Sequence, residues 1–442
     1  MGYGSYPKYG WWARGNGGER LAHYFIEGGR PLYGKVRVQG AKNAALPILA
    51  ATVLAEGIHE IHDVPQLSDI EAMGRILESL GVKVKRNGNT VYLDTRTIHS
   101  SYIPASLMKR MRSSIFLMGP LLARQREVCV TRPGGCAIGE RPIDLHLKGL
   151  RLLGAEVIEK DGQIRCTAKK LTGRKVRFEL PSVGATENIM MAAVRANGVT
   201  IIQNAAREPE IIDLQNFLNG MGAQIRGAGT SQIVIHGVEH LTPISYRIIP
   251  DRIVTGTLAA AVAATGGEVI MTHTVPEHST TVLNLLRQAG ATIAADKDTL
   301  KVSGKKRLQG VGRIVTEPYP GFPTDMQPQM MAVLATATGK SMMEERIFDA
   351  RLKHVRELNR MGASITIEKQ GVQICGVPTL KGADVQATDL RAGAALVIAG
   401  LCAEGTTRVS GIEHIERGYE QLDLVFQQLG GKVARMPASA VN

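Results

Sequence analysis

The sequence has few cysteines and few aromatic residues, and each scarcity excludes a class of protein. Its five cysteines (positions 129, 136, 166, 375 and 402) are scattered through 442 residues without a C-x-x-C pair. An odd, dispersed set of this kind argues against both a disulfide framework and a zinc ribbon. Aromatic residues make up 4% of the chain, too few to indicate a surface that stacks nucleic-acid bases.

Long apolar runs and cofactor fingerprints are also missing. The longest apolar runs, around 44–55 and 393–403, fall short of the roughly 18 residues that a membrane-spanning helix needs. The N-terminus lacks the apolar segment of a secretory signal, so we expect a cytoplasmic protein without a membrane partner. Neither a Walker motif, a G-x-G-x-x-G fingerprint, a G-x-S-x-G elbow nor a metal-ligand spacing occurs, and we expect no cofactor and no metal.

The composition is that of a large globular chain with a basic surplus. Hydrophobic residues make up 44% and charged residues 21%, and 442 residues favour two domains over one core. The net charge of +13 suits an anionic partner, whether nucleic acid, a phosphorylated metabolite or an acidic membrane. A well-solvated basic surface is the alternative interpretation.

A sixfold repeat organises the chain. Six segments share a helical leucine pattern that ends at a glycine and continues as two short alternating strands, although the last copy lacks a clear second strand. Glycine readily adopts the left-handed conformation that ends a helix, so each segment predicts a helix, a glycine cap and a β-hairpin. The glycines, separated by 73, 68, 68, 72 and 68 residues, are Gly81, Gly154, Gly222, Gly290, Gly362 and Gly430.

A helix of small residues followed by a strand precedes each of these segments. Each unit therefore predicts helix, strand, helix, strand, strand, and six units, three per domain, fill the chain. Helix N-termini attract anions, although Asp and Ser there can equally be ordinary caps, an alternative we accept for Asp251 and Ser182. Lys42 and Arg112 oppose the helix dipole and need another explanation. The residues at the six helix starts are Lys42, Arg112, Ser182, Asp251, Asp325 and Asp389.

A glycine- and proline-rich segment, 131–146, carries one thiol. Cys136 lies between Arg132 and Arg141, and nearby cations favour the reactive thiolate form of a cysteine. The alternative is a small residue that happens to be cysteine. His146, which follows on a helix, is more often a hydrogen-bonded structural residue than a base.

Three further segments place charged residues at helix starts. Prolines in the segment 316–329 restrict the backbone before Asp325. The carboxylate of Asp325 can accept a proton from a hydroxyl or simply cap the helix. The segment ATDLRAG holds Asp389 beside Arg391, and HIERGYE holds Arg417. Arginine binds carboxylates and phosphates in a bidentate manner, so the last two segments indicate an anionic substrate.

Taken together, these segments resemble a known family. GAKNAALP, MRSSIFLMGPLLAR, PGGCAIGERPIDLH, SVGAT, NAAREPEI, FPTDMQPQ, ATDLRAG and ERGYE occur in the order found in UDP-N-acetylglucosamine 1-carboxyvinyltransferases, the enolpyruvyl transferases of peptidoglycan synthesis. The resemblance covers roughly residues 28–429. It implies an inside-out α/β barrel of two domains, with 42–249 as one domain and 1–41 plus 250–442 as the other. Residues 1–20 would be a disordered extension.

The resemblance also implies a reaction. The enolpyruvyl group of phosphoenolpyruvate passes to the 3′-hydroxyl of UDP-N-acetylglucosamine, and phosphate leaves. Asp325 would take the hydroxyl proton, and Asp389 would tune the charge that develops on the enolpyruvyl carbon. Cys136 would be the proton donor, the site of a covalent adduct and the target of fosfomycin. The residues implied for phosphoenolpyruvate are Lys42, Asn43, Arg141, Arg391 and Arg417, of which Lys42 and Arg417 also count as catalytic.

The nucleotide sugar would lie against a second set of residues. By the same resemblance these are Asn43, Arg112, Arg141, Pro142, Ile143, Asp144, Leu145, Pro181, Ser182, Val183, Asp325 and Ile347. Two positions depart from the family pattern. Leu180 stands where some members carry a lysine, and DARLKH at 349–354 replaces a more usual acidic-Asn-Arg-Phe-x-His, although Arg351 and His354 remain.

Two other functions compete with a transferase that acts as a monomer on these two substrates. A catalytically inactive paralogue that serves as a regulator or scaffold would bind the sugar without turning it over, but such proteins usually lose a catalytic residue first. Nucleic-acid binding is suggested by the charge alone. Without a dense basic run or interleaved aromatic residues, we expect no nucleic-acid partner.

Overall fold

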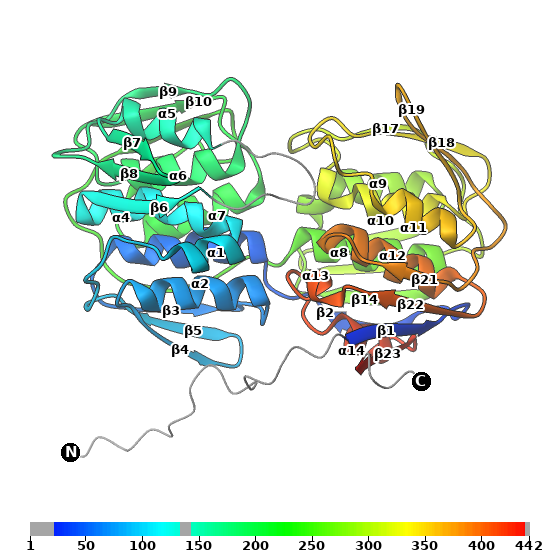
Figure 1. Ribbon diagram of the computed structural model, residues 1–442. Coiled ribbons are helices and arrows are strands. Elements are labelled where there is room, and N and C mark those ends of the chain that lie inside the picture. Colours follow the sequence, from blue (N-terminus) through cyan, green and yellow to red (C-terminus); the bar gives the residue numbers. More distant parts are fainter. Residues whose placement is uncertain (1–21, 133–142, 438–442) are drawn as a thin grey trace, which may run out of the picture.

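The computed structural model describes residues 22–132 and 143–437, with the side chains of all but positions 109, 110, 112 and 113 (Figure 1). Each of the six predicted units contributes a buried helix, a strand, a second helix and a terminal strand or hairpin. In the half built from residues 42–249 the units are α1 (Lys42–Ala51), β3 (Ile58–His62), α2 (Ser68–Ser79), β4 (Lys83–Asn87), β5 (Thr90–Asp94); α4 (Met118–Gln125), β6 (Glu127–Thr131), α5 (Asp144–Leu152), β7 (Glu156–Lys160), β8 (Gln163–Thr167); and α6 (Val183–Ala193), β10 (Val199–Gln203), α7 (Pro209–Gly220), β11 (Gln224–Arg226), β12 (Gln232–His236).

The other half repeats this order. Its units are α8 (Arg252–Thr265), β14 (Glu268–Thr272), α9 (Thr280–Gln288), β15 (Thr292–Asp296), β16 (Thr299–Ser303); α10 (Gln327–Leu334), β18 (Lys340–Glu344), α11 (His354–Arg360), β19 (Ser364–Glu368), β20 (Gly371–Cys375); and α12 (Leu390–Cys402), β22 (Thr406–Ser410), α14 (Leu422–Gln428), β23 (Lys432–Pro437). Shorter elements lie between units: α3 (Ala105–Arg110), α13 (Ile412–Ile415) and the 3₁₀ turns η1 (Thr52–Leu54), η2 (Arg112–Leu117), η3 (Pro276–Ser279) and η4 (Thr324–Met326).

The six predicted glycine caps are confirmed. All six glycines have positive φ, between 86° and 107°, which is the left-handed region that a side chain disfavours. Five of the hairpins that follow pair antiparallel as expected, for example β4 with β5 and β19 with β20. In the sixth unit, β23 has no following strand among the described residues and pairs instead with β1 (Ala22–Glu27), which also pairs with β22. The start of the chain thus completes the last unit.

Short parallel strands at the sheet edges tie the units together. In two sheets this edge strand lies far in the sequence from its partner, on one of the two segments that connect the halves. β2 (Tyr33–Arg37) pairs with β14, and β13 (Ser245–Arg247) pairs with β3. The two crossing segments run side by side, with the Ala41 amide donating to Ile249 at 2.8 Å and the Asp251 amide to Gln39 at 2.9 Å. The remaining edge strands are β9 (Lys175–Arg177), β17 (Gly312–Val315) and β21 (Asp384–Gln386).

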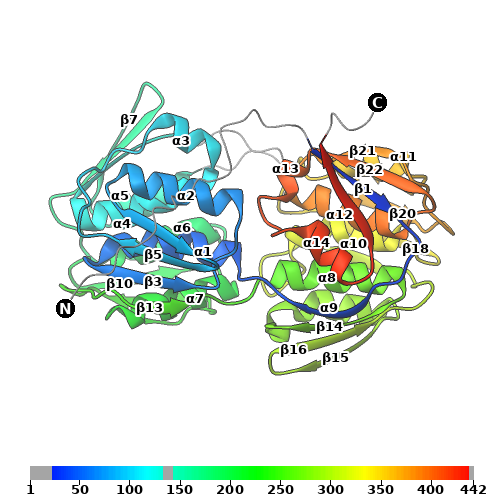
Figure 2. The same cartoon turned by 90° about the horizontal axis from the view of Figure 1, so that it is seen from below.

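The first helix of each unit lies inside and the sheets lie outside, so the predicted inside-out α/β architecture is confirmed. Every residue of α12 from Arg391 to Leu401 is buried, and in α8 every residue from Ile253 to Ala263. Helices without a polar face require burial on all sides, which small side chains permit. One hydrophobic core spans 45–248, and a second combines 24–38 with 253–433. The elements that carry the two cores form the two halves seen in Figure 2. These cores agree with the expected division, although the domain boundaries stay a prediction.

No helix in the described part of the chain is both long and apolar enough to span a bilayer.

Candidate active site

Several predicted site residues lie outside the described residues. These are Cys136, Arg141 and Pro142, together with the side chain of Arg112 and the extension over 1–20. The remaining predicted residues lie on both sides of the boundary between the two halves, mostly at the starts of buried helices.

A buried carboxylate brings together the two cations predicted to be catalytic. Lys42 is the first residue of α1, and its Nζ lies 3.1 Å from Oδ2 of Asp69. From the other half of the molecule, Nε of Arg417 donates to Oδ1 of the same carboxylate at 2.9 Å. Desolvation would raise the pKa of Asp69, but the charges of Lys42 and Arg417 outweigh it and hold the pKa below its usual value.

Sequence reasoning missed Asp69. It stands in the first turn of α2, where an acidic residue is ordinary because it complements the helix dipole. Its contact with Arg417 joins residues 348 positions apart, which no local pattern indicates. The structure therefore adds a third member to the Lys42–Arg417 pair.

Asp325 lies between two arginines. Arg351 Nη2 is 2.6 Å from Oδ1, and Arg391 Nη2 is 2.8 Å from Oδ2. The two arginines outweigh desolvation, which acts in the opposite direction, and hold the pKa of Asp325 well below its usual range. Asp325 does not cap a helix but sits in η4, with 27% of its side chain exposed. The carboxylate is therefore ionised, open to solvent and able to accept a proton, although it is a weak base.

Arg351 is a second residue whose importance the sequence did not show. Its side chain is 3% exposed, and besides Asp325 it donates to Oγ1 of Thr324 at 2.9 Å. A buried arginine on a carboxylate needs that carboxylate to remain charged. The motif around 349–354 places this arginine next to the predicted base.

A buried polar network supports Arg391. Arg391 Nη1 donates to the hydroxyl of Tyr419 at 3.2 Å, and that hydroxyl lies 2.9 Å from Oγ1 of Thr257. Gln329 Nε2 reaches the Tyr419 hydroxyl at 3.2 Å and the carbonyl of Asp325 at 2.9 Å. Tyr419 is 2% exposed and comes two residues after Arg417, so one segment carries Arg417 and supports Arg391.

The two remaining aspartates at helix starts act as caps. Asp389 accepts hydrogen bonds from the amides of Arg391 and Ala392, at 2.9 and 3.0 Å, and Asp251 caps α8 in the same way. Asp251 also accepts the backbone amide of Lys42 at 3.3 Å. Burial raises the pKa of Asp251, and Arg391 opposes this increase. Asp251 therefore contacts the backbone of Lys42 and feels the charge of Arg391, which itself binds Asp325.

The residues predicted for the nucleotide sugar gather at two neighbouring helix starts. Ile143, Asp144 and Leu145 lead into α5, whereas Pro181, Ser182 and Val183 lead into α6. Ser182 caps α6 by accepting the Ala185 amide at 3.3 Å, as the capping alternative expected. Asn43, in the same half, is half-buried beside Lys42, whereas Ile347 lies in the other half, after β18, and is 37% exposed.

His146 is a buried, hydrogen-bonded residue, as expected from the sequence. It is 7% exposed, and its Nδ1 lies 2.8 Å from Nδ2 of Asn188. Because Asn188 Oδ1 accepts the Gly119 amide at 2.7 Å, its Nδ2 must be the donor to His146. Nδ1 of His146 is then unprotonated, and the ring packs between α5 and α6.

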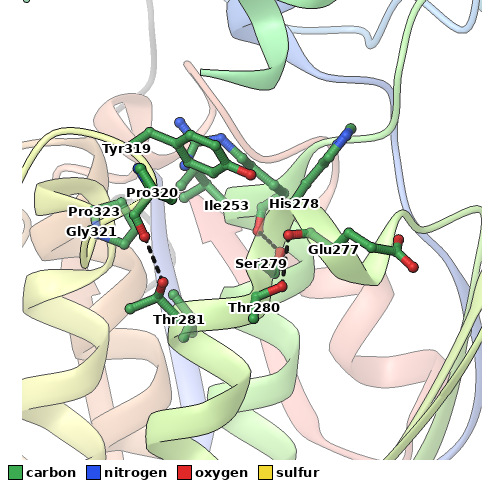
Figure 3. Close-up of a pocket in the computed structure, with 12 residues that line it drawn as sticks. Ile253, Glu277, His278, Ser279, Thr280, Thr281, Tyr319, Pro320, Gly321 and Pro323 are labelled. Carbon is green, nitrogen blue, oxygen red and sulfur yellow. Dashed lines mark hydrogen bonds between the residues drawn. The ribbon is translucent and has the colours of Figure 1, made fainter. Parts of the chain in front are cut away.

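A small pocket adjoins the proline-rich segment that precedes Asp325, and Pro323 is one of its lining residues (Figure 3). Its walls come from the start of α8, from η3 and α9, and from the proline-rich segment before η4. Hydrogen bonds fix the walls, with Thr281 Oγ1 donating to the Pro320 carbonyl at 2.7 Å and Ser279 Oγ to the Arg252 carbonyl at 3.1 Å. These hydrogen bonds hold the proline-rich segment before Asp325 against α8 and α9.

The chain is similar to several known proteins over most of its length. The family model described as EPSP synthase (3-phosphoshikimate 1-carboxyvinyltransferase) matches residues 26–425. UDP-N-acetylglucosamine 1-carboxyvinyltransferase 2 of Caldanaerobacter subterraneus subsp. tengcongensis is 52% identical over 94% of this chain and 100% of its own length. UDP-N-acetylglucosamine 1-carboxyvinyltransferase 1 of Carboxydothermus hydrogenoformans is also 52% identical, over 94% of this chain and 99% of its own.

Solved structures share the fold at lower identity. The enolpyruvyl transferase NikO from Streptomyces tendae superposes with a TM-score of 0.85 at 23% identity, covering 95% of this chain and 99% of its own. EPSP synthase from Acinetobacter baumannii gives 0.75 at 19% identity, covering 94% and 100%. The six-unit architecture, the charged helix starts and the extent of sequence identity lead to one assignment. The chain belongs to the EPSP synthase family and, within it, to the UDP-N-acetylglucosamine 1-carboxyvinyltransferases.

Proposed function

We propose that this protein transfers the enolpyruvyl group of phosphoenolpyruvate to the 3′-hydroxyl of UDP-N-acetylglucosamine and releases phosphate, the first committed step of peptidoglycan synthesis. The observation that carries the proposal is a pair of charged clusters at the boundary between the halves. Lys42 and Arg417 bind Asp69, and Arg351 and Arg391 bind Asp325. They place cations for an anionic substrate next to an ionised carboxylate that can accept a proton. We expect the reaction in the cytoplasm, with the enzyme acting as a monomer.

The chemistry follows from these groups. Asp325 accepts the 3′-hydroxyl proton as the sugar oxygen attacks C2 of phosphoenolpyruvate, while the Cys136 thiol gives a proton to C3. Lys42 and Arg417 bind the phosphate and carboxylate throughout. Loss of a proton from C3 then expels phosphate and restores the double bond, leaving the enolpyruvyl ether.

A weak base suits this step only if it acts together with bond formation. The pKa of Asp325 lies far below that of an alcohol, so it cannot form a free alkoxide. The hydroxyl becomes acidic as its oxygen bonds to C2, and the proton then passes readily to the carboxylate. Arg351 and Arg391 hold that carboxylate in a fixed orientation through both oxygens.

The residues of the nucleotide-sugar site remain part of the proposal. The diphosphate would lie at the starts of α5 and α6, where first-turn amides favour an anion. Ile347 would contact the sugar from the half that carries Asp325, and Asn43 from the half that carries Lys42. Cys136, Arg141, Pro142 and the Arg112 side chain keep the roles that the family resemblance implies.

Phosphate release from phosphoenolpyruvate tests the proposal. We expect release only when UDP-N-acetylglucosamine is present, with Cys136→Ser and Asp325→Ala each lowering kcat by about 10²–10⁴-fold. Cys375→Ser, a half-buried strand cysteine, and Asp384→Ala, an exposed aspartate, serve as matched controls and should retain full activity. A folded wild type that binds the sugar but releases no phosphate would instead be an inactive paralogue.

A further inference from the structure

The starts of α5 and α6 lie side by side and point the same way. A β-carbon placed on Gly184, in the first turn of α6, would lie 3.1 Å from Cε1 of His146 in the first turn of α5. Further along both helices, a β-carbon on Gly149 would lie 2.5 Å from Cδ1 of Ile189. The helices are therefore parallel neighbours, and their two N-termini open onto the same region.

Neither helix start is fully closed by its own side chains. The residue that caps α5 is Ile143, which makes no side-chain cap hydrogen bond, and Ser182 accepts a single amide of α6. Adjacent helix starts with uncapped amides favour an anion. If the proposed function holds, on which this inference rests, the diphosphate of the nucleotide sugar binds there.

One exposed cation reaches over this region. Lys148 lies four residues after Asp144 and therefore on the same face of α5, one turn further on. Its Nζ donates to Oε1 of Glu179, three residues before the Ser182 cap of α6. The ammonium group therefore lies beside the segment that leads into α6, although it is carried by α5.

The present partner of Lys148 can be replaced. The side chains of Lys148 and Glu179 are 46% and 63% exposed, and ion pairs this open to solvent contribute little. A diphosphate carries more charge than one carboxylate and would lie between two helix starts, so it competes well for the ammonium. Leu180, the next residue, is 72% exposed and offers no charge of its own.

We propose that Lys148 is a binding residue for the nucleotide sugar, leaving Glu179 to contact the substrate diphosphate. Its four-carbon stem lets the ammonium move between the two anions without any change in the helix. This role affects recognition of the sugar nucleotide and leaves the reacting atoms untouched.

Steady-state kinetics of Lys148→Met test the assignment, since methionine keeps the stem and removes the charge. We expect the KM for UDP-N-acetylglucosamine to rise about 10- to 100-fold, as for loss of one charged hydrogen bond, with kcat and the KM for phosphoenolpyruvate unchanged. The control is Lys301→Met, which removes an equally exposed lysine paired with Glu268 in the other half. It should alter no constant.

A second-site variant separates binding from a structural effect. In Lys148→Met/Leu180→Lys, a lysine carried by the α6 segment can reach the same phosphates, so the KM should return most of the way to the wild-type value. Glu179→Gln should lower the KM below that of the wild type because it frees Lys148. A structural role for Lys148 would predict neither change.

Calorimetric titration with UDP-N-acetylglucosamine distinguishes failure of this inference from failure of the proposed function. A wild type that neither binds the sugar nor releases phosphate would overturn both. If the wild type binds and Lys148→Met binds equally well, the role of Lys148 is wrong and the transferase assignment stands. If the wild type binds the sugar without turnover and Lys148→Met binds it more weakly, the binding role of Lys148 stands and the transferase assignment falls.

Discussion

At the scale of single residues, the charges around Asp325 decide its chemistry. Two arginines hold its oxygens at 2.6 and 2.8 Å and keep its pKa well below the usual range. A carboxylate in this environment stays ionised through the whole range in which the enzyme would work. Loss of activity at mildly acidic pH should therefore arise from other groups.

Removing one of the two arginines should raise the pKa of Asp325 into the pH range in which activity can be measured. Arg351→Met takes away one of the two cations, so the pKa of Asp325 rises and the carboxylate becomes protonated at a higher pH. We expect the acidic limb of kcat/KM against pH to move upward relative to wild type, with activity lost earlier as the pH falls. Arg346→Met removes an exposed arginine bound to Glu344 and should leave the profile in place. An unchanged profile in Arg351→Met would contradict the role given to Asp325.

Asp213 is a buried carboxylate whose pKa is shifted in the direction opposite to that of Asp325. Burial raises its pKa to about 6, although Tyr246 and the Ile249 amide donate hydrogen bonds to it. The folded state therefore binds this proton more tightly than the unfolded state, and stability falls as the pH rises from about 4 to about 6.

The Asp213→Asn variant should lack this loss. Urea titrations at pH 4 and pH 8 should show the variant gaining up to about 3 kcal/mol on wild type between the two conditions. An equal difference between variant and wild type at both pH values would show that Asp213 does not titrate in this way.

At the site, the sequence indicated residue types but not their partners. Lys42, Asp325 and Arg391 stand out because charged residues at the starts of buried helices need a reason. Arg417 was expected to open the last helix, but it lies between α13 and α14, since α14 begins only at Leu422. Asp69 and Arg351 do not stand out, because an acidic first turn and an arginine in a loop are both common. Their roles come from contacts between distant segments, which only the folded chain creates.

At the scale of elements, the repeat was readable because each unit uses the same local chemistry. A glycine with positive φ ends the second helix of every unit, and an alternating hairpin follows five of the six. The edge strands β9, β13, β17 and β21 were not predicted, since three or four residues cannot display an alternating pattern. The helix starts at Arg112 and Asp325 also differ, because the chain first forms 3₁₀ turns there.

Two glycines of the fifth unit should respond differently to alanine. Gly362 has a φ of 88°, and no atom lies within 4 Å of a β-carbon added there. Gly362→Ala should therefore cost only backbone strain, about 1–2 kcal/mol. At Gly376, just after β20, a β-carbon would lie 1.6 Å from the Ala337 carbonyl oxygen, so the backbone would have to move. Gly376→Ala should therefore destabilise the protein more than Gly362→Ala in chemical denaturation. The reverse order would contradict the close strand contact.

At the scale of the whole molecule, the halves are joined by the crossing strands and by buried charges. Besides Arg417 and Asp69, Nε of Arg252 lies 3.0 Å from Oε1 of Glu210, with the side chains 11% and 4% exposed. The crossing of the two segments could not be predicted from the local sequence, because no local pattern indicates that β2 joins the sheet of β14. The pairing of these distant segments arises only in the folded chain.

The Arg252–Glu210 pair should act as one unit in stability. Arg252→Met leaves Glu210 buried without its partner, which should cost about 3–5 kcal/mol of unfolding free energy. Arg252→Met/Glu210→Gln removes both charges and should recover part of that loss. Denaturant unfolding of the two variants and of Glu210→Gln completes the cycle, and simple addition of the single losses would show that the pair is not coupled.

The transferred group itself provides the most direct test of the whole account. The enzyme is incubated with UDP-N-acetylglucosamine and phosphoenolpyruvate labelled with ¹³C at C2 and C3, and the product is analysed by NMR. We predict that the labelled vinyl group becomes bonded through oxygen to C3 of the sugar, with an equal amount of phosphate released. Label that remains in phosphoenolpyruvate, or appears as free pyruvate without a sugar ether, would contradict enolpyruvyl transfer.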